Sequence, residues 1–435
     1  MKCRSTKNPA EQVSLTRAVL ESLPADRGLY VPETMPDLSE RICSSLRDLS
    51  FEDLAFEVIR PYFDEDLSES ELREVVAESL TFDAPAVSVA PAMQVLELWH
   101  GPTLAFKDFG ARFMARTMSR LQRRVGEDLT VLVATSGDTG AAVASGFYGV
   151  EGVNVWVLYP KGRVSPVQEM QLTSFGGNIS AVEVDGTFDD CQALVKHAFL
   201  DPDLAGPLTL TSANSINLSR LLPQMFYYFR AWQQVVDDGV LPTFCVPSGN
   251  LGNLCAGLFA RSMGLPVGGF VAATNVNDAF VRFLREGTVP HRSAQRTLSN
   301  AMDVAAPSNL QRIEWLFSGS REALHEVVHA HPVTDDATLE VMARVYRDHG
   351  YVLDPHTAVG WRAAEIHREA FPNQSMVVLA TAHPAKFPET VQRAIGREPE
   401  APEALTAAKG RPRHHIALPA DYGRLRERLL DESPS

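Results

Sequence analysis

The sequence predicts an α/β protein built on two parallel sheets, each covered by helices on both faces. From residue 129 onward, β-branched runs of strand length alternate with segments of helix length and helical spacing. Strands that alternate with helices form parallel sheets, because each crossover helix lets the next strand run in the same direction. The chain has 435 residues, which is long enough for two such units.

The expected elements fall into two groups along the chain. In the first group the strands are LTVLVAT, VNVWVLYP and NISAVEVDG, and the helices are AAVASGFYG, SPVQEMQLTSFG and FDDCQALVKHAFL. In the second group the strands are TFCVPS, GGFVAAT and SMVVLATAH, and the helices are DATLEVMARVYRDHG and HTAVGWRAAEIHREA. The expected domains are a mainly helical N-terminal region at 1–90, a larger α/β domain at 91–128 and 210–395, a smaller α/β domain at 129–209, and a C-terminal surface segment ending in a helix at 396–435.

The composition is typical of a soluble globular protein, with 45% hydrophobic and 22% charged residues. A net charge of -14 argues against a nucleic-acid partner and against an anionic membrane surface, although a local pocket can still bind an anionic small molecule. The five cysteines are odd in number and form no CxxC pair, so we expect a reducing compartment, no disulfide framework and no metal site. We recognise neither a signal peptide nor a transmembrane run, and we expect a cytoplasmic protein.

One lysine, Lys107, stands out in the stretch HGPTLAFKDFGARFM at residues 100–114. Most lysines lie on solvated faces, but this one follows an apolar run and precedes a segment of helical spacing from Phe109 to Met118. A lysine held among apolar groups has a lowered pKa, because desolvation disfavours the ammonium form. Since a neutral amine can form a Schiff base with an aldehyde, Lys107 is a candidate nucleophile.

Two glycine-containing loops lie where an expected strand gives way to an expected helix. They are TSGDTG at 135–140 and PSGNLGN at 247–253. Backbone amides at a helix N-terminus attract an anion, and ligands of open α/β sheets bind beyond the carboxyl ends of the strands. Either loop alone is weak evidence, because such turns are common. Two of them in one chain with Lys107 favour a site for phosphate or carboxylate groups.

Two further segments carry polar side chains that could join this site. SANSINLSRLLPQ at 212–224 brings Ser215, Asn217 and Arg220 to a helix start, although an N-cap followed by a solvated arginine would give the same pattern. LATAHPAKFPE at 379–389 puts Thr381 at the end of a buried strand. The histidines near the motifs lack metal-ligand spacing and are expected to be structural, namely His100, His356 and His383.

Pyridoxal phosphate is a cofactor that needs these parts together. It requires a lysine for a Schiff base, a cradle for its phosphate and a partner for its ring nitrogen. Lys107, the loop at 249–253 and Thr381 could meet these needs in turn.

The motifs together resemble the threonine synthase family, whose members are pyridoxal-phosphate enzymes of the tryptophan-synthase β fold, also called fold type II. The resemblance spans nearly the whole chain and is carried by RGLYVPETMP, HGPTLAFKDFGARFM, TSGDTGAA, SANSINLSRLLPQ, PSGNLGNL, AATNVNDAFVRFL, TLSNAMDVAAPSN and TAHPAKFPE. Glycine loops alone would suit many relatives, whereas HGPTLAFKDFG with NSIN and TAHPAKF is far more specific. The length and pattern resemble the long bacterial and fungal type.

The resemblance implies the last step of threonine biosynthesis, in which O-phospho-L-homoserine and water give L-threonine and phosphate. It implies that Lys107 binds the cofactor covalently and that Thr381 contacts the ring nitrogen. The positions implied to hold the cofactor phosphate are Gly249, Asn250, Leu251, Gly252 and Asn253. The positions implied to bind substrate are Ser136, Gly137 and Thr139 at its carboxylate, and Ser215, Asn217 and Arg220 at its phosphate.

Asp138 departs from the pattern of the wider fold. Many relatives have an asparagine at this position, where it bonds the 3-oxygen of the cofactor. We expect Asp138 to lie at the cofactor site, where its carboxylate could accept a proton from that oxygen or point away from it.

Several alternatives stay open. A phospho-lyase could release 2-oxobutyrate from the same substrate, because the outcome depends on where water is held. Other fold-type-II enzymes, such as serine or threonine dehydratases and cysteine synthases, fit the NSIN and TAHPAKF segments less well. A non-catalytic relative that binds the cofactor would be expected to lose Ser215 and Arg220, which are present. We expect a small-molecule partner and a monomer or weak homodimer.

Overall fold

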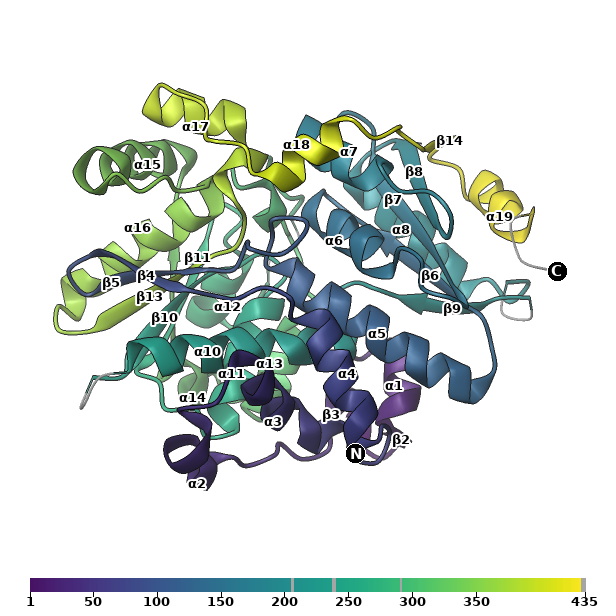
Figure 1. The fold of residues 1–435 in the computed structure, drawn as a ribbon, viewed down its shortest axis with the longest axis horizontal. Helices are drawn as coiled ribbons and strands as arrows, with labels where there is room; N and C mark the ends of the chain where they lie inside the picture. Colours follow the sequence, from purple (N-terminus) through teal and green to yellow (C-terminus); the bar gives the residue numbers. More distant parts are fainter. Residues whose placement is uncertain (205–206, 237–239, 290–291, 432–435) are drawn as a thin grey trace.

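A computed structural model describes residues 1–204, 207–236, 240–289 and 292–431 of the chain. Two open sheets surrounded by helices make up most of this part, and a small third sheet lies near the N-terminus (Figure 1). The expected α/β class is confirmed. Each strand-like run named above contains a strand, and each helix-like run contains a helix.

The larger sheet has the strand order β12-β11-β10-β13-β5-β4 within the described residues. Its neighbouring strands run parallel, except that β4 pairs with β5 in the antiparallel sense. Its strands are β4 (Ala86–Ala90), β5 (Met93–Glu97), β10 (Pro242–Pro247), β11 (Gly269–Thr274), β12 (Val328–Pro332) and β13 (Ser375–Ala380).

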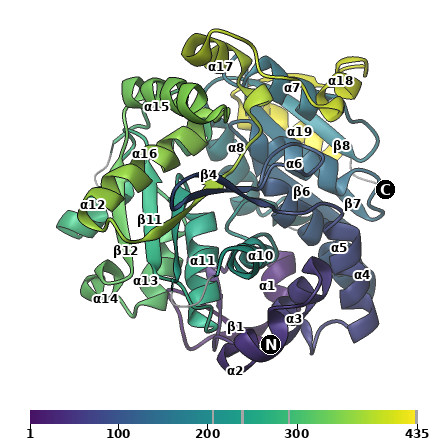
Figure 2. The same cartoon turned by 60° about the vertical axis from the view of Figure 1, so that its left-hand side comes forward.

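Helices cover both faces of the larger sheet (Figure 2). In β11, Phe270 and Ala272 face one core while Val271 and Ala273 face the other, because successive side chains of a strand point to opposite faces. This is why the strand sequences are apolar throughout rather than alternating. The helices are α10 (Met225–Val235) and α11 (Gly252–Ser262) on the first side, and α15 (Asp335–His349) and α16 (Pro355–Ala370) on the second.

The smaller sheet has the order β14-β8-β7-β6-β9 in the part of the chain that the structure describes, and all its pairs are parallel. Its strands are β6 (Leu129–Ala134), β7 (Val153–Pro160), β8 (Ile179–Asp185), β9 (Thr209–Ser212) and β14 (Ile416–Pro419). The helices packed around it are α6 (Asp138–Phe147), α7 (Pro166–Thr173), α8 (Phe188–Leu200) and α19 (Tyr422–Asp431).

The terminal regions contain more sheet than the sequence indicates. Residues 1–90 include an antiparallel sheet of β1 (Lys2–Ser5), β2 (Gln12–Ser14) and β3 (Tyr30–Pro32) beside their helices. The segment after 396, expected to cross the surface before a last helix, forms α18 (Glu403–Lys409) and then adds β14 to the edge of the smaller sheet. An open strand edge such as that of β8 explains the pairing, because its unpaired backbone groups are a template for another strand. The boundaries of the four expected domains remain predictions.

The remaining elements are mostly short and connect the units above. They are α1 (Leu15–Glu21), α2 (Ser39–Arg41), a π-helical turn (Ile42–Leu46), α3 (Phe51–Phe63), α4 (Glu69–Ser79), α9 (Leu218–Leu221), α12 (Ala279–Glu286), α13 (Leu310–Leu316), α14 (Arg321–His325), α17 (Pro388–Ile395), and 3₁₀ turns at Leu222–Gln224, Asn300–Met302 and Pro384–Lys386.

Helix α5 (Lys107–Val125) carries Lys107 at its first position and runs from the centre of the molecule outward (Figure 1). It packs against α4, α6 and α9, so one helix touches the N-terminal region, the smaller sheet's helices and the segment with Arg220. Phe113 anchors it by edge-on contacts with Phe63 at 5.7 Å and Phe226 at 5.8 Å between ring centroids. The packing of α5 therefore fixes the position of Lys107 at its N-terminus.

Three properties of the described residues concern membranes, metals and disulfides. No helix among them is long and apolar enough to cross a membrane. No group of three or more His, Cys, Asp and Glu side chains in those ranges is placed to hold a metal ion. The cysteines whose side chains are described are buried and unpaired, namely Cys3, Cys191, Cys245 and Cys255. The side chain of Cys43 lies outside the described part.

We expect Leu121→Ala to destabilise the protein through α5. Leu121 is fully buried, so truncation removes apolar contacts and leaves a cavity, which should lower the free energy of unfolding by about 2–5 kcal/mol. Leu200→Ala is the matched control, because Leu200 is 62% exposed at the end of α8 and should change stability by less than about 0.5 kcal/mol. Urea unfolding followed by circular dichroism measures both. Equal effects of the two substitutions would contradict the packing described for α5.

Candidate active site

A cavity of about 1150 Å³ opens where strands β6, β7, β9, β10 and β13 end. This is the place where open α/β sheets bind ligands. The predicted site residues that line it are Lys107, Ser136, Asp138, Thr139, Ser215, Arg220, Gly249, Asn250, Leu251, Gly252, Asn253 and Thr381. Gly137 and Asn217 are the predicted residues that do not, and each has a structural reason given below.

Backbone pairing positions Lys107 at the floor of the cavity. The Phe106 N–H donates to the Thr381 carbonyl at 2.9 Å, and the His383 N–H donates to the Leu104 carbonyl at 3.0 Å. Leu104 has a φ of 58°, a left-handed conformation that turns the chain into α5 directly afterwards. The start of α5 is thus tied to the end of β13, and Lys107 and Thr381 come to the same cavity.

The electrostatic surroundings of Lys107 favour a neutral amine. Burial, opposed by the charge of Asp138 and assisted by the charges of Arg220 and Lys386, lowers the pKa of Lys107 to about 8. Lys107 forms no hydrogen bond or ion pair with any residue in the described ranges. Its ammonium lies 5.9 Å from the centroid of the Phe106 ring. A lysine with a depressed pKa and an unengaged amine is suited to nucleophilic attack and to proton transfer.

The loop at 247–253 is closely packed at its two glycines. A Cβ at Gly249 would lie 2.8 Å from the Met302 Cα, and a Cβ at Gly252 would lie 3.3 Å from the Ser215 Cβ. Leu251 adopts a left-handed φ of 60° and starts α11 at Gly252. The Asn253 amide donates to the Pro247 carbonyl at 2.8 Å and closes the loop on itself. The loop is therefore a rigid, glycine-lined turn at a helix N-terminus, which is the form of a phosphate cradle.

These features fit the requirements of pyridoxal phosphate. The amine of Lys107 is unengaged, the glycine loop has no side chain at the two positions where one would crowd its neighbours, and Thr381 lies at the end of β13 on the cavity wall. Residues that would hold the cofactor are thus present on three different elements around one cavity.

The TSGDTG loop is held by its first threonine. The Thr135 hydroxyl accepts hydrogen bonds from the N–H of Gly137 at 3.0 Å and of Gly140 at 2.9 Å. Gly137 has a φ of 137°, and a Cβ there would lie 2.4 Å from the side chain of Gln168. Gly137 is therefore required for close approach to α7, and it is not among the residues that line the cavity, so its contact with the substrate stays a prediction. Ser136 and Thr139 on either side of it do line the cavity.

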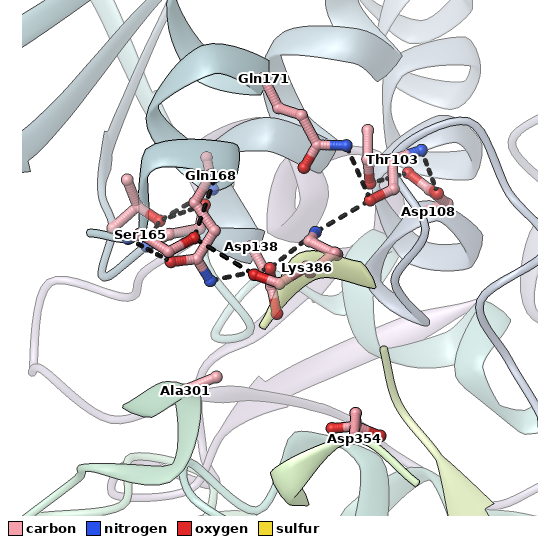
Figure 3. A network of polar contacts seen from close by, with 12 residues as sticks. Thr103, Asp108, Asp138, Ser165, Gln168, Gln171, Ala301, Asp354 and Lys386 are labelled. Carbon is pink, nitrogen blue, oxygen red and sulfur yellow. Dashed lines mark hydrogen bonds and ion pairs between the residues drawn. The ribbon is translucent and has the colours of Figure 1, made fainter. Parts of the chain in front are cut away.

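Asp138 is engaged by a second buried lysine (Figure 3). The Lys386 ammonium lies 2.7 Å from the Asp138 carboxylate, and both side chains are almost completely buried. Gln168 also donates to this carboxylate at 3.0 Å. Burial alone would raise the pKa of Asp138, but the positive charges of Lys386 and Lys107 outweigh it and hold that pKa well below its usual range. Asp138 is thus an anion in the cavity wall.

The SANSINLSRLLPQ segment puts two of its three predicted side chains on the cavity. The Ser215 hydroxyl accepts from the amides of Asn250 at 2.7 Å and Asn309 at 3.1 Å, so its own proton remains free to donate. Arg220 is buried and donates to the Ala213 carbonyl at 2.8 Å, while its Nε has no partner among the described residues. Burial lowers the pKa of Arg220 to about 10. An unpaired buried guanidinium donor at a cavity wall is suited to bind an anion.

Asn217 is the third predicted side chain, and the structure gives it another role. Its amide donates to the Val19 carbonyl at 2.8 Å and to the Ser22 hydroxyl at 2.7 Å. Its oxygen accepts from the Ser219 N–H at 2.9 Å and so caps α9. Its hydrogen-bonding capacity is used inside the protein in the described structure, and its direct contact with the substrate stays a prediction. Asn217 instead holds the helix that carries Arg220.

Two residues at or near the cavity, Lys386 and Arg312, are not predicted from the sequence. Lys386 lies in the TAHPAKFPE motif, where its apolar neighbours indicate a buried lysine as those of Lys107 do. Arg312 is fully buried and donates to the carbonyls of Tyr30 at 3.0 Å and Ser215 at 3.1 Å, which braces the Ser215 segment against the N-terminal region. Nothing in the sequence around Arg312 indicates this burial.

His356 is a cavity residue for which the sequence predicts a structural role. It lines the cavity, and its Nδ1 lies 2.9 Å from the Asp354 carboxylate. Its Nε2 accepts from the Ala301 N–H at 3.2 Å, which fixes the proton on Nδ1. The pair holds the 300–302 turn in place over the glycine loop, so the structural expectation agrees with its contacts.

Comparisons with known proteins identify the family to which the chain belongs. Residues 95–382 match the family described as pyridoxal-phosphate dependent enzyme, residues 2–80 match the threonine synthase N terminus, and residues 357–428 match the threonine synthase C-terminal family. Threonine synthase from Escherichia coli is 43% identical over 99% of this chain and 100% of its own length. Threonine synthase from Saccharomyces cerevisiae is 35% identical over 90% of this chain and 88% of its own length.

Solved structures give the same result. The crystal structure of PLP-bound threonine synthase from Brucella melitensis has a TM-score of 0.93 and 35% identity, covering 100% of both chains. That of threonine synthase from Escherichia coli has a TM-score of 0.92 and 42% identity, covering 99% of this chain and 100% of that one. With family matches along most of its length and relatives that it covers end to end, this chain belongs to the threonine synthase family of pyridoxal-phosphate-dependent enzymes and has their fold type II architecture.

Proposed function

We propose that this protein converts O-phospho-L-homoserine and water to L-threonine and inorganic phosphate with pyridoxal phosphate as cofactor. The single observation that carries the proposal is a cavity in which an unengaged lysine, a glycine-lined turn and an unpaired buried arginine meet. Full-length similarity to threonine synthases supports the same reaction. The substrate has a carboxylate and a phosphate, and the cavity offers separate donors for each.

The cofactor, when bound, supplies an aldehyde that reacts with amines and a ring that stabilises negative charge on carbon. Lys107 would hold it covalently, Gly249 to Asn253 would hold its phosphate, and Thr381 would face its ring nitrogen. Asp138 borders the same cavity, but its carboxylate is held by Lys386, so its contact with the cofactor stays a prediction.

Lys107 is also the group suited to move protons on the substrate. Its amine has a pKa lowered to about 8 and makes no ion pair with any described residue, so it can take a proton from Cα and later return one. Ser136 and Thr139 would orient the substrate by its carboxylate through their hydroxyls at the start of α6. Ser215 and Arg220 would hold the substrate phosphate and stabilise the charge that it carries away as it leaves.

We further propose that the protein works in the cytoplasm as a monomer or weak homodimer. The net charge of -14 and the scattered cysteines support this setting.

Product analysis tests the reaction. Incubation with O-phospho-L-homoserine should release threonine and phosphate in equal amounts, measured together by amino-acid analysis and a phosphate assay. The cofactor-free protein is the control. Phosphate released with 2-oxobutyrate instead of threonine would identify the phospho-lyase alternative, and release of neither would indicate a non-catalytic relative.

Covalent labelling tests the role of Lys107 against that of Lys386. Borohydride reduction of the cofactor-loaded protein, followed by peptide mapping, should place the label on Lys107, because the Lys386 ammonium is engaged by a carboxylate and is not nucleophilic. The Lys107→Ala variant should lose the absorption of the bound cofactor. A label on Lys386 or on the exposed Lys161 would exclude the assignment.

Arg220→Ala tests the site for the substrate phosphate. Removing a charge-assisted contact of about 3 kcal/mol should lower kcat/KM for O-phospho-L-homoserine by roughly 100-fold, while the absorption of bound cofactor is retained. Arg261→Ala is the matched control, because Arg261 is exposed at the end of α11. Normal turnover, or loss of the cofactor together with turnover, would show that Arg220 does not act on the substrate phosphate.

A further inference from the structure

The ion pair between Lys386 and Asp138 joins the two α/β units at the cavity floor. Asp138 begins α6 after the first strand of the smaller sheet, and Lys386 lies in the 3₁₀ turn that follows β13 of the larger sheet. The two charged atoms are 2.7 Å apart, with side-chain exposures of 4% for Asp138 and 0% for Lys386. Water screens the attraction within such a buried pair only weakly, and direct contacts fix the geometry of the pair.

The surrounding hydrogen bonds hold both partners in this arrangement (Figure 3). The Lys386 ammonium also donates to the Thr103 carbonyl at 2.9 Å. On the other side, Gln168 donates to Asp138 at 3.0 Å and accepts from the Ser165 N–H at 3.0 Å. Lys386 therefore has its donors directed at a carboxylate and a carbonyl, and it is held as a cation.

The Asp138 carboxylate also affects the pKa of Lys107. Among the described groups that act on its pKa, Asp138 is the one that raises it, while burial, Arg220 and Lys386 lower it. Asp138 in turn experiences the charges of Lys386 and Lys107. The carboxylate thus has two lysines within its influence but forms its ion pair with Lys386 alone in the described residues.

We propose that Lys386 is a positioning residue that keeps Asp138 paired and so leaves the Lys107 amine without a counter-ion, available as a nucleophile and a base. Without Lys386, the buried Asp138 carboxylate would lack a cation. Lys107 is the nearby group able to supply one, and it would do so as an ammonium ion that can neither attack an aldehyde nor accept a proton. This inference rests on the role proposed above for Lys107.

The test reads the Lys107 amine directly, without substrate or turnover. The full-length chain, freed of cofactor, is labelled with trace acetic anhydride over a range of pH, and the fraction of Lys107 acetylated is measured by peptide mass spectrometry. In the wild-type protein we expect a labelling midpoint well below about 10.4, the ordinary value for lysine. A wild-type midpoint at or above that value would mean that Lys107 is already paired and would overturn the proposal.

Lys386→Met removes the charge and retains an unbranched apolar stem. We expect the Lys107 midpoint to rise by about one pH unit or more, as for a lysine that gains an opposite charge at close range. The double variant Lys386→Met with Asp138→Asn should return the midpoint to near the wild-type value, because no unpaired carboxylate remains. The control is Lys161→Met, since Lys161 is 61% exposed and pairs with Glu183 at 3.4 Å outside the cavity, and it should leave the midpoint unchanged.

An unchanged midpoint in folded Lys386→Met would overturn the proposal and make Lys386 a structural residue only. If circular dichroism shows that this variant does not fold, the double variant and the wild type decide, because both are expected to show a lowered midpoint and an ordinary value in either contradicts the proposal. Failure of the proposed reaction would instead appear in the product analysis, which the labelling does not involve.

Discussion

The burial of positively charged side chains around one cavity is the constraint on which the arrangement of the site depends. A cation removed from water is costly unless it is paired or hydrogen-bonded. Lys386 has the carboxylate of Asp138, and Arg312 has backbone carbonyls. Lys107 and Arg220 have no ion pair in the described part of the chain, and both open onto the cavity. Lys107 and Arg220, which line the cavity without an ion pair to any described residue, are the side chains that the proposed reaction assigns to the cofactor and the substrate.

Backbone pairing, rather than side-chain packing, brings these charges to one place. The segment at 104–106 pairs with the segment at 381–383, and Lys107 and Lys386 follow these two segments along the chain. One short antiparallel contact therefore sets the positions of both lysines relative to Asp138. Helix α5 follows this contact and is anchored by the packing of its buried Phe113. A change that loosened this contact would shift the nucleophile and its electrostatic surroundings together.

The sequence predicts the fold and much of the site because those features are local. Apolar strands alternating with helices identify both sheets, and an apolar setting identifies Lys107 as unusual. The contacts of Asn217 could not be predicted, because a motif gives the type of side chain but not its direction. The pairing of Lys386 with Asp138 joins residues far apart in the chain, and β14 joins the smaller sheet from the C-terminal segment. Only the tertiary fold determines such partners.

Lys386 and Arg312 meet the cost of burial in two ways, with different effects on the cavity. A carboxylate cancels the charge of Lys386, so that pair contributes little net potential at a distance. Carbonyl oxygens solvate Arg312 without cancelling its charge, and Arg220 is likewise unneutralised by any ion pair among the described residues. Arg312 and Arg220 therefore place positive charge beside the carbonyls of Ser215 and Ala213, within a chain whose net charge is -14. Positive charge held at a cavity wall favours the binding of a phosphate-bearing substrate there, whatever the net charge of the protein.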